Sequence, residues 1–380
     1  MQQMQQGRQQ QPQREGNFNA ATRQTIVQQP DQVWPGSAAQ ITRLDLPQTG
    51  FFSGIWLLLQ GSIVTASASS GAAEDYPLTP YSLIRKIRIY NNQNVELWNT
   101  SGYGAYIYQR TLRTAFDTFG TINEAVPAAA RFGNVTNPLA QYYKEVANLG
   151  ASATGTFRGG LYLPVVWGFP QEHGLQLAQD PAIRYSMEIT WGDLTDLMPT
   201  SGQSGTVTLQ TSTKCSVACE LFQVPEEGID FPNMAFTKTV LEDIQALSAG
   251  TGDNTYNFVT GNVLTRMIHE CSNIVSSNRQ PIDPTAFSNF QLQYAQVQKP
   301  YVINPDIQLL RQRVLYGSDL PPGVLVHELQ TGLGLPEMPT TRDVLNTSRL
   351  TDLQSIITLS GVTLSTGQLR TIRCQLSANR

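Results

Sequence analysis

Charged residues are scarce in this chain of 380 residues. Asp, Glu, Lys and Arg together make up 14% of it, against about 25% in an ordinary soluble domain. A surface so poor in charge must be covered by uncharged polar residues or buried against other chains, because a buried unpaired charge is costly. The formal net charge is −4 and no block of like charges occurs, so no sequence-specific nucleic-acid partner is predicted.

Histidine is almost missing. His173, His269 and His327 are the whole set, and they stand in unrelated contexts. His327 begins a motif like the helix of a zinc protease, but the residue four positions on is Thr331 where a second His is needed. His327 also ends an apolar run, which is typical of a strand residue. The sequence therefore predicts no metal site.

The four cysteines form no disulfide framework. Cys215 and Cys219 alternate within a strand pattern, which places them roughly 13 Å apart on one face and beyond disulfide reach. We expect small core residues and reduced thiols. Because a P-loop, a dinucleotide-binding fingerprint and a nucleophile turn are also missing, the sequence predicts no catalytic residue, no cofactor and no enzyme activity.

Long hydrophobic runs are missing as well. The most apolar run, residues 51–64, is interrupted by Gly54, Gln60 and Gly61. It falls short of the roughly 20 apolar residues that span a bilayer. The N-terminus is rich in Gln and shows no apolar segment with a cleavage site. These features predict a protein that is soluble and cytosolic when made.

The first 36 residues differ from the rest. Gln fills more than a third of residues 1–30, and the charges there are Arg8, Arg14, Glu15 and Arg23. Such a stretch cannot bury enough apolar surface to fold alone. We expect an extended or helical N-terminal arm over residues 1–36. It is either a solubilising tail or a segment that docks on a neighbour or a membrane.

From residue 37 onward the dominant signal is the two-residue period of β-strands. Ile183–Trp191 is the clearest case, with Ile183, Tyr185, Met187, Ile189 and Trp191 on one face, and Gly205–Gln223 repeats the pattern. Further strands are expected at Gln40–Leu46, Phe51–Thr65, Leu83–Tyr90, Thr156–Val166, Tyr256–Ile268, Phe290–Val297, Val324–Leu329 and Ile372–Leu376.

Helical signals are few. Tyr103–Phe119 and Asp343–Ile357 are predicted helices, the second because its apolar residues lie near helical spacing. Many short strands with turns between them predict an all-β chain that forms an antiparallel sandwich or barrel. Residues 224–233 hold two prolines, a glycine and three acids and are the predicted linker. The domains on either side, residues 37–223 and 234–380, are each long enough for an eight-stranded jelly roll.

Four stretches resemble a specific family. They are Thr22–Gln29 at the end of the arm, Leu83–Tyr90 with the following Asn99–Tyr103, Gly160–Trp167 with the following Pro181–Trp191, and Leu320–Leu325. These stretches, in this order, are similar to the tectivirus-type double jelly-roll major capsid proteins. The resemblance covers most of the chain, although residues 234–301 match least.

The resemblance implies an architecture and a set of partners. It implies two consecutive eight-stranded antiparallel jelly rolls standing normal to a shell, and a homotrimer of near-hexagonal outline. It also implies an icosahedral capsid lattice over an internal membrane, with penton or spike proteins as further partners and the virion as location. Arg8, Arg14 and Arg23 of the arm would face lipid headgroups or neighbouring subunits.

Two other classes of protein fit part of the pattern. A β-sandwich that binds a receptor or carbohydrate, like a spike or lectin, would use exposed aromatic residues near its loop tips. The candidates are Tyr103, Tyr106, Tyr108, Tyr142 and Tyr143, which packing between jelly rolls or between subunits explains equally well. A cupin-like enzyme needs a histidine cluster, which three scattered histidines do not supply.

Overall fold

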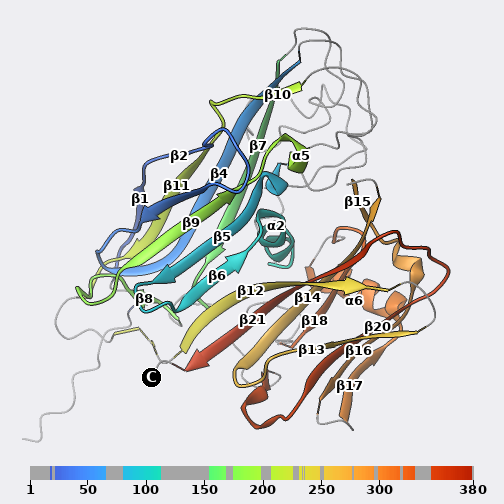
Figure 1. Cartoon of the computed structure of the whole chain (residues 1–380). Helices are drawn as coiled ribbons and strands as arrows, with labels where there is room; N and C mark the ends of the chain where they lie inside the picture. The colour runs from blue at the N-terminus through green and yellow to red at the C-terminus, as the bar shows by residue number, and fades with distance from the viewer. Residues whose placement is uncertain are drawn as a thin grey trace, which may run out of the picture.

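The computed structural model describes residue 18 and residues 22–65, 80–112, 154–167, 174–197, 207–225, 231–232, 234, 236–248, 252–275, 278–294, 298–316, 320–329 and 344–378. Within them the chain forms two β-sandwiches side by side, the first coloured blue to green and the second yellow to red (Figure 1). No helix in these ranges is long and apolar enough to cross a membrane.

The first sandwich is an eight-stranded jelly roll. Its strands, in chain order, are β1 (Gln24–Gln28), β3 (Ile41–Asp45), β4 (Phe51–Thr65), β5 (Ile84–Asn91), β6 (Glu96–Thr100), β7 (Thr154–Pro164), β9 (Tyr185–Trp191) and β11 (Lys214–Phe222). One sheet has the order β1-β11-β4-β7 and the other β3-β9-β5-β6, with antiparallel pairs throughout. The first, eighth, third and sixth strands thus face the second, seventh, fourth and fifth, which is jelly-roll topology.

The second sandwich repeats this order. Its eight strands are β12 (Phe236–Leu247), β13 (Asp253–Asn257), β14 (Val263–Val275), β16 (Phe287–Tyr294), β17 (Gln298–Ile303), β18 (Val324–Glu328), β20 (Leu353–Leu359) and β21 (Gly367–Ala378). The sheets are β12-β21-β14-β18 and β13-β20-β16-β17, again antiparallel. Two eight-stranded jelly rolls are confirmed, and each strand of one roll has a counterpart in the other.

Each roll carries one helix at the same point of its topology. Helix α2 (Gly102–Arg110) connects the fifth and sixth strands of the first roll, and α6 (Pro305–Tyr316) connects those of the second. The remaining elements are short: β2 (Gln32–Val33), β8 (Gln176–Leu177), β10 (Val207–Leu209), β15 (Asn278–Pro281), β19 (Leu345–Asn346), α5 (Leu194–Leu197) and three single-turn 3-10 helices at Tyr81–Leu83, Pro284–Ala286 and Thr347–Arg349.

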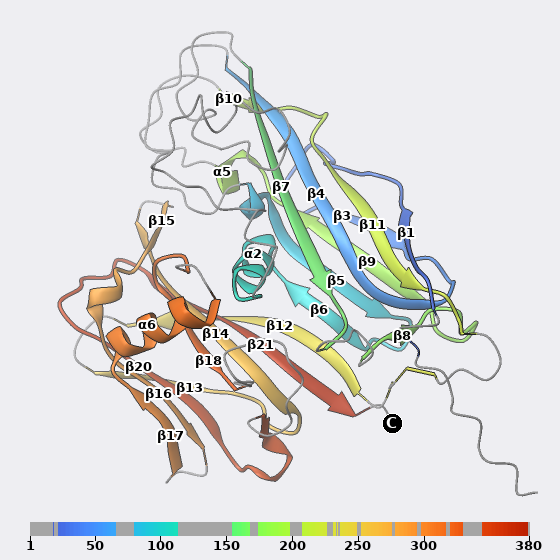
Figure 2. The ribbon, with the colours of Figure 1, turned by 180° about the vertical axis from the view of Figure 1, so that it is seen from behind.

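The rolls are joined by a shared sheet. Strand β6 of the first roll pairs with β12 of the second in parallel, Trp98 opposite Val240 and Asn99 opposite Leu241. Ten strands therefore run through both rolls as one sheet. Figure 2 shows from behind that α2 lies between the two rolls. The predicted linker, residues 224–233, falls between β11 and β12.

Most predicted strands are present within a few residues of their expected bounds. The stretch Gly205–Gln223 forms β10 and β11 along one edge of β4, interrupted by a turn at residues 210–213. Tyr256–Ile268 is not one strand, because the chain turns at Gly261, whose φ of +122° suits glycine, and passes from β13 in one sheet to β14 in the other. The two runs belong to opposite faces of the second sandwich.

The helix predictions had mixed outcomes. Tyr103–Phe119 contains α2, and its last residues lie outside the described ranges. The predicted helix at Asp343–Ile357 is wrong: β19, a 3-10 turn and β20 occupy the described part of it. Strand β20 lies between β13 and β16, and Ile356 and Ile357 are both buried. The two faces of β20 mix apolar and polar residues, with Ile356 between Gln354 and Thr358 on one face and Ser355 beside Ile357 on the other. The strand therefore lacks a clean alternation, and its apolar residues imitated helical spacing.

The end of the predicted arm belongs to the first roll. Residues 24–28 form β1, which pairs with β11 from Gln24–Phe222 to Gln28–Ala218. Phe18 is also buried, at 3% exposed, and packs against Phe51 and Phe222. Although the arm is too poor in apolar residues to fold alone, Phe18 joins the core of the first roll.

Candidate functional site: the junction between the two rolls

Apolar side chains from both rolls form one continuous core across the junction. Trp98 on β6 and Tyr108 on α2 meet edge to face with ring centroids 5.1 Å apart. Val240, Ile268 and Ile372, on three strands of the second roll, belong to the same buried cluster. They lie on the outward face of the second roll's sheet, whereas Met267 and Leu369 lie in that roll's own core. The junction is therefore packed like a domain interior.

Helix α2 is placed by its first residues. The hydroxyl of Ser101 accepts a hydrogen bond from the N–H of Gly104 at 2.9 Å, which caps the helix. The carboxylate of Glu242 on β12 accepts from the Ser101 N–H at 2.5 Å. A Cβ at Gly104 would collide with the carboxylate of Glu242, so a larger residue there would force that carboxylate to move.

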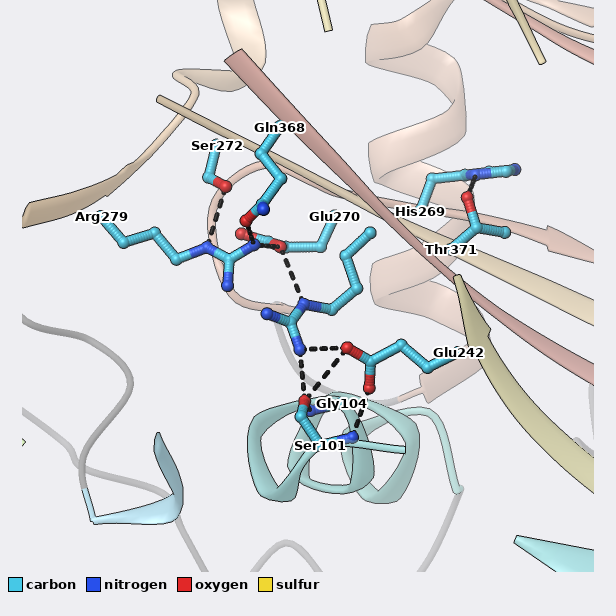
Figure 3. A network of polar contacts seen from close by, with 10 residues as sticks. Ser101, Gly104, Glu242, His269, Glu270, Ser272, Arg279, Gln368 and Thr371 are labelled. Atoms are coloured by element: carbon cyan, nitrogen blue, oxygen red, sulfur yellow. Dashed lines mark hydrogen bonds and ion pairs between the residues drawn. The ribbon is translucent and has the colours of Figure 1, made fainter. Parts of the chain in front are cut away.

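Glu242 also begins a chain of buried charges (Figure 3). Arg370 on β21 donates to Glu242 and to the Ser101 hydroxyl, and its Nε lies 3.5 Å from Glu270. Glu270 accepts from Arg279 at 2.9 Å, and Arg279 also donates to Ser272 and Gln368 at 2.8 Å. The side chains of Arg370, Glu242 and Glu270 are 6%, 5% and 1% exposed. Charges this buried are tolerated only when each has a partner.

A second buried ion pair lies at the other end of α2. Nε of Arg266 on β14 is 2.6 Å from Glu328 on β18, and both side chains are 2% exposed. Arg266 also donates to the hydroxyl of Thr111, just after α2, at 3.1 Å. The Tyr316 hydroxyl of α6 donates to Glu328 at 3.1 Å. Hydrogen bonds thus fix both ends of α2 to the second roll.

A cavity of about 290 Å³ opens beside the charge network. Three of its lining side chains are Arg85, Arg279 and Arg370. Arg85 pairs with Asp196 at 2.9 Å, and the other two pair with Glu270 and Glu242. Because the positive charges are matched one for one, this cavity has no excess charge to attract an anion.

Metal and acid–base chemistry find no support in the described ranges. There, no three His, Cys, Asp or Glu side chains gather as a metal site requires. His269 and His327 lie buried in the second roll, and burial lowers the pKa of His269 to about 3. Burial also raises the pKa of the Cys215 and Cys219 thiols to about 12. These groups are held uncharged in the interior, away from any substrate.

The sequence-predicted site residues are spread widely. Arg8 and Arg14 lie outside the described residues, and Arg23 is exposed just before β1. Tyr103 and Tyr108 are 2% and 1% exposed. Tyr106 stacks on Tyr81 with centroids 4.6 Å apart. These three rings pack inside the chain and offer no sugar platform, whereas Tyr142 and Tyr143 lie outside the described ranges.

Packing between the rolls was one of the explanations considered for Tyr103 and Tyr108, but the charged residues of the junction were not predicted. A weak signal was available for Glu242 and Glu270, since each interrupts an apolar strand and such an acid needs a buried partner. Nothing in the sequence identified Arg370 as that partner, because it lies 128 residues from Glu242.

No family model matches this chain, and no curated protein does. Solved structures do. The chain is similar to the MCP of STIV, Sulfolobus Turreted Icosahedral Virus, with a TM-score of 0.65 and 13% identity over 94% of this chain and 97% of that one. It is similar to the PBCV-1 virus capsid, with a TM-score of 0.59 and 9% identity over 93% and 94%.

A third likeness is to the major capsid protein of bacteriophage PM2, with a TM-score of 0.51 and 10% identity over 94% of this chain and 98% of that one. The double jelly roll predicted from the sequence is therefore confirmed by structures that match along nearly the whole chain. At such low identity these similarities establish the fold alone.

Proposed function

We propose that this chain is the major capsid protein of an icosahedral virus and that it acts as a structural protein with no enzymatic role. Three copies form a capsomer of near-hexagonal outline, and capsomers tile a shell over an internal membrane. Its place is the virion, after synthesis in the host cytoplasm. Its partners are further copies of itself, penton or spike proteins at special positions of the lattice, and membrane lipids.

The observation that carries this proposal is the repetition of one roll twice in a rigid chain. Both rolls have the same strand order and the same helix position, and a shared ten-stranded sheet and an apolar core join them. Two equivalent rolls per chain give a trimer six similar units, which suits a hexagonal lattice position. The solved structures with this fold are named as virus capsid proteins.

The proposed roles of the arm rest on its composition. Arg8, Arg14 and Arg23 are spaced along a Gln-rich segment that can reach lipid headgroups or a neighbouring capsomer. Three arginines and one acid give a weak, salt-sensitive attraction to an anionic membrane, since each cation near such a surface contributes about 1 kcal/mol.

The binding of a carbohydrate or receptor is the competing function, and the buried positions of Tyr103 and Tyr108 weigh against it. One experiment separates the two. Native mass measurement and electron microscopy of the purified chain are expected to show trimers that form hexagonal arrays at raised concentration. A chain that stays monomeric at micromolar concentration, or one that binds sugars without forming arrays, would overturn the capsid proposal.

A further inference from the structure

Helix α6 exposes three aliphatic side chains. Ile307, Leu310 and Val314 are 60%, 63% and 68% exposed. At spacings of three and four residues they lie on one face of the helix, and we call them the α6 stripe. The opposite face, packed on the second roll, presents Gln308 and Gln312, each 2% exposed. The packed face also buries Leu315 and Tyr316. Two buried glutamines together with three exposed aliphatic residues are nevertheless unusual for a surface helix.

The buried glutamine of α6 has a counterpart in α2. Oε1 of Gln312 accepts from the N–H of Val326 on β18 at 2.8 Å, and Nε2 donates to the carbonyl of Val324 at 3.1 Å. Oε1 of Gln109 on α2 accepts from the N–H of Tyr162 on β7 at 3.1 Å. Strands β7 and β18 are the sixth strands of their rolls. Both helices are therefore fastened to equivalent strands by the same kind of bond.

The two helices also begin alike. The carbonyl of Ser101 accepts from the N–H of Ala105 at 2.9 Å, and that of Asn304 accepts from Gln308 at 3.0 Å. Each cap precedes its glutamine, Gln109 or Gln312, by eight positions. The helices thus correspond residue by residue from cap to glutamine.

This correspondence assigns a counterpart to every residue of the α6 stripe. Ile307, Leu310 and Val314 correspond to Gly104, Ile107 and Thr111 of α2. In α2, Gly104 lies against Glu242 of the second roll, and Thr111 accepts a hydrogen bond from Arg266 of the second roll. Ile107 between them is fully buried. The face that α2 buries against a neighbouring roll is therefore the face that α6 exposes.

We propose that the α6 stripe of one copy packs against the first roll of a second copy, repeating between chains the contact that α2 makes within a chain. The inference rests on the proposed function and specifies the contact surfaces of its trimer. The contact is heterologous, joining two different surfaces, and such contacts generate closed rings when the rotation between copies permits it.

The receiving surface follows from the same correspondence. Within the chain, α2 meets the outward face of β12, β14 and β21, the first, third and eighth strands of the second roll, through Glu242, Arg266 and Arg370. The corresponding strands of the first roll are β1, β4 and β11.

Apolar side chains mark this face of the first roll. Ile26 on β1 is 65% exposed. Trp56 and Leu58 on β4 are partly exposed and alternate with the buried Ile55, Leu57 and Leu59, so they point outward. An aliphatic stripe on one copy thus meets an apolar face on the next.

The strand edges agree with this arrangement. Within the chain, β6 pairs in parallel with β12, the fifth strand of one roll with the first strand of the next. For a contact between chains, the fifth strand of the second roll is β17 and the first strand of the first roll is β1. Among the described residues, each of these two is the last strand at one edge of its sheet. Unpaired strand edges are ready to pair with another chain. The backbone therefore supplies a second contact in the same place as the α6 stripe.

Three variants test the inference. Leu310→Glu charges the α6 stripe, and Leu58→Glu charges the receiving face. Val259→Glu is the matched control, because Val259 is 77% exposed on the second roll and belongs to neither surface. We expect both interface variants to raise the dissociation constant of the trimer about 30-fold or more, as loss of a central apolar contact does, and the control to leave it unchanged. Melting of each variant checks that the rolls stay folded.

Mixing the two interface variants tests the direction of the contact. Leu310→Glu keeps an intact receiving face and Leu58→Glu keeps an intact α6 stripe, so an equimolar mixture is expected to give one-to-one dimers that cannot close into trimers. Two results would overturn this inference and leave the proposed function standing. One is a Leu310→Glu trimer as tight as that of the control. The other is an interface variant that is less stable as a monomer, because its own chain would then cover the stripe. A wild-type chain that stays monomeric would overturn the proposed function as well.

Discussion

Two histidines meet inside the second roll. The rings of His269 and His327 lie 5.4 Å apart, edge to face, and His327 stacks on Phe290 at 3.9 Å. The two ring nitrogens of His269 share hydrogen bonds with Thr371 and Ser355, each 3.0 Å long. Burial lowers the pKa of His269 to about 3 and that of His327 well below its ordinary value. Both rings are therefore neutral in the folded protein at neutral pH.

This pair makes stability depend on pH. In the unfolded chain both rings take up a proton near pH 6.5, whereas in the folded chain they stay neutral. The free energy of unfolding is therefore largest above about pH 6.5 and decreases as the pH falls from there toward 3. Two histidines give a slope approaching roughly 2.7 kcal/mol per pH unit below pH 6. We expect the urea midpoint to fall between pH 7 and 5, and the slope to be about half as steep in His269→Gln. Equal slopes in the two proteins would contradict this assignment.

The four cysteines are free and buried, as the sequence predicts. Their burial disfavours the thiolate, which is the reactive form. We expect a thiol reagent to find no reactive thiol in the native protein and four after unfolding without reductant. Each Cys→Ser change at Cys215, Cys219 or Cys374 should cost about 1–3 kcal/mol through a buried hydroxyl. Fewer than four thiols in the unfolded protein would show that a disulfide forms.

At the scale of elements, strands were predictable where one face is wet. Strand β9 alternates buried and half-exposed residues and was found from its pattern. Strand β12 and helix α6 were missed. At two buried positions α6 has glutamine where an ordinary helix has leucine, so the spacing of its apolar residues does not mark its buried face. The proposed contact of α6 with another chain would explain its exposed apolar face, but a single sequence carries no local pattern that reveals such a contact.

The buried ion pair between β14 and β18, beside the junction, is testable at Arg266 and Glu328. Removing one partner leaves the other charged and buried, so Arg266→Met and Glu328→Leu should each cost about 3–5 kcal/mol. The double variant, which removes both charges, should cost much less than the sum of the two. Denaturant unfolding of all four proteins forms a double-mutant cycle. Additive losses would mean that the two residues do not act as a pair.

At the scale of the whole molecule, part of the N-terminal segment belongs to the first roll. Residues 24–28 belong to a sheet and Phe18 to a core, whereas Arg8 and Arg14 precede both. The boundaries predicted for the arm and the two domains remain proposals. A deletion through residue 30 removes a strand along with the arm, so an effect of that deletion on assembly could arise from lost folding.

Two truncations separate the effect on folding from the effect on assembly. Deleting residues 1–17 should leave the melting temperature within a few degrees yet weaken both lattice assembly and co-sedimentation with anionic vesicles, the latter more at low salt than at high salt. Deleting residues 1–30 should also lower the melting temperature, because Phe18 and β1 are lost and burial of one Phe contributes about 1.5–3 kcal/mol. If the shorter truncation assembles and binds vesicles as well as the intact chain, the arm is only a tail.

The sequence by itself determined the all-β class and most of the strands, because alternation is a local pattern that a half-buried sheet imposes on nearby residues. The two jelly rolls were predicted from the resemblance to the double jelly-roll capsid proteins. It also determined the free cysteines. The tertiary structure alone decided how the rolls join. The parallel pair of β6 and β12, the partnership of Glu242 with Arg370, and the correspondence of Gln109 with Gln312 each link residues more than a hundred positions apart. Such pairings depend on where the folded chain brings strands together, and no local pattern encodes that.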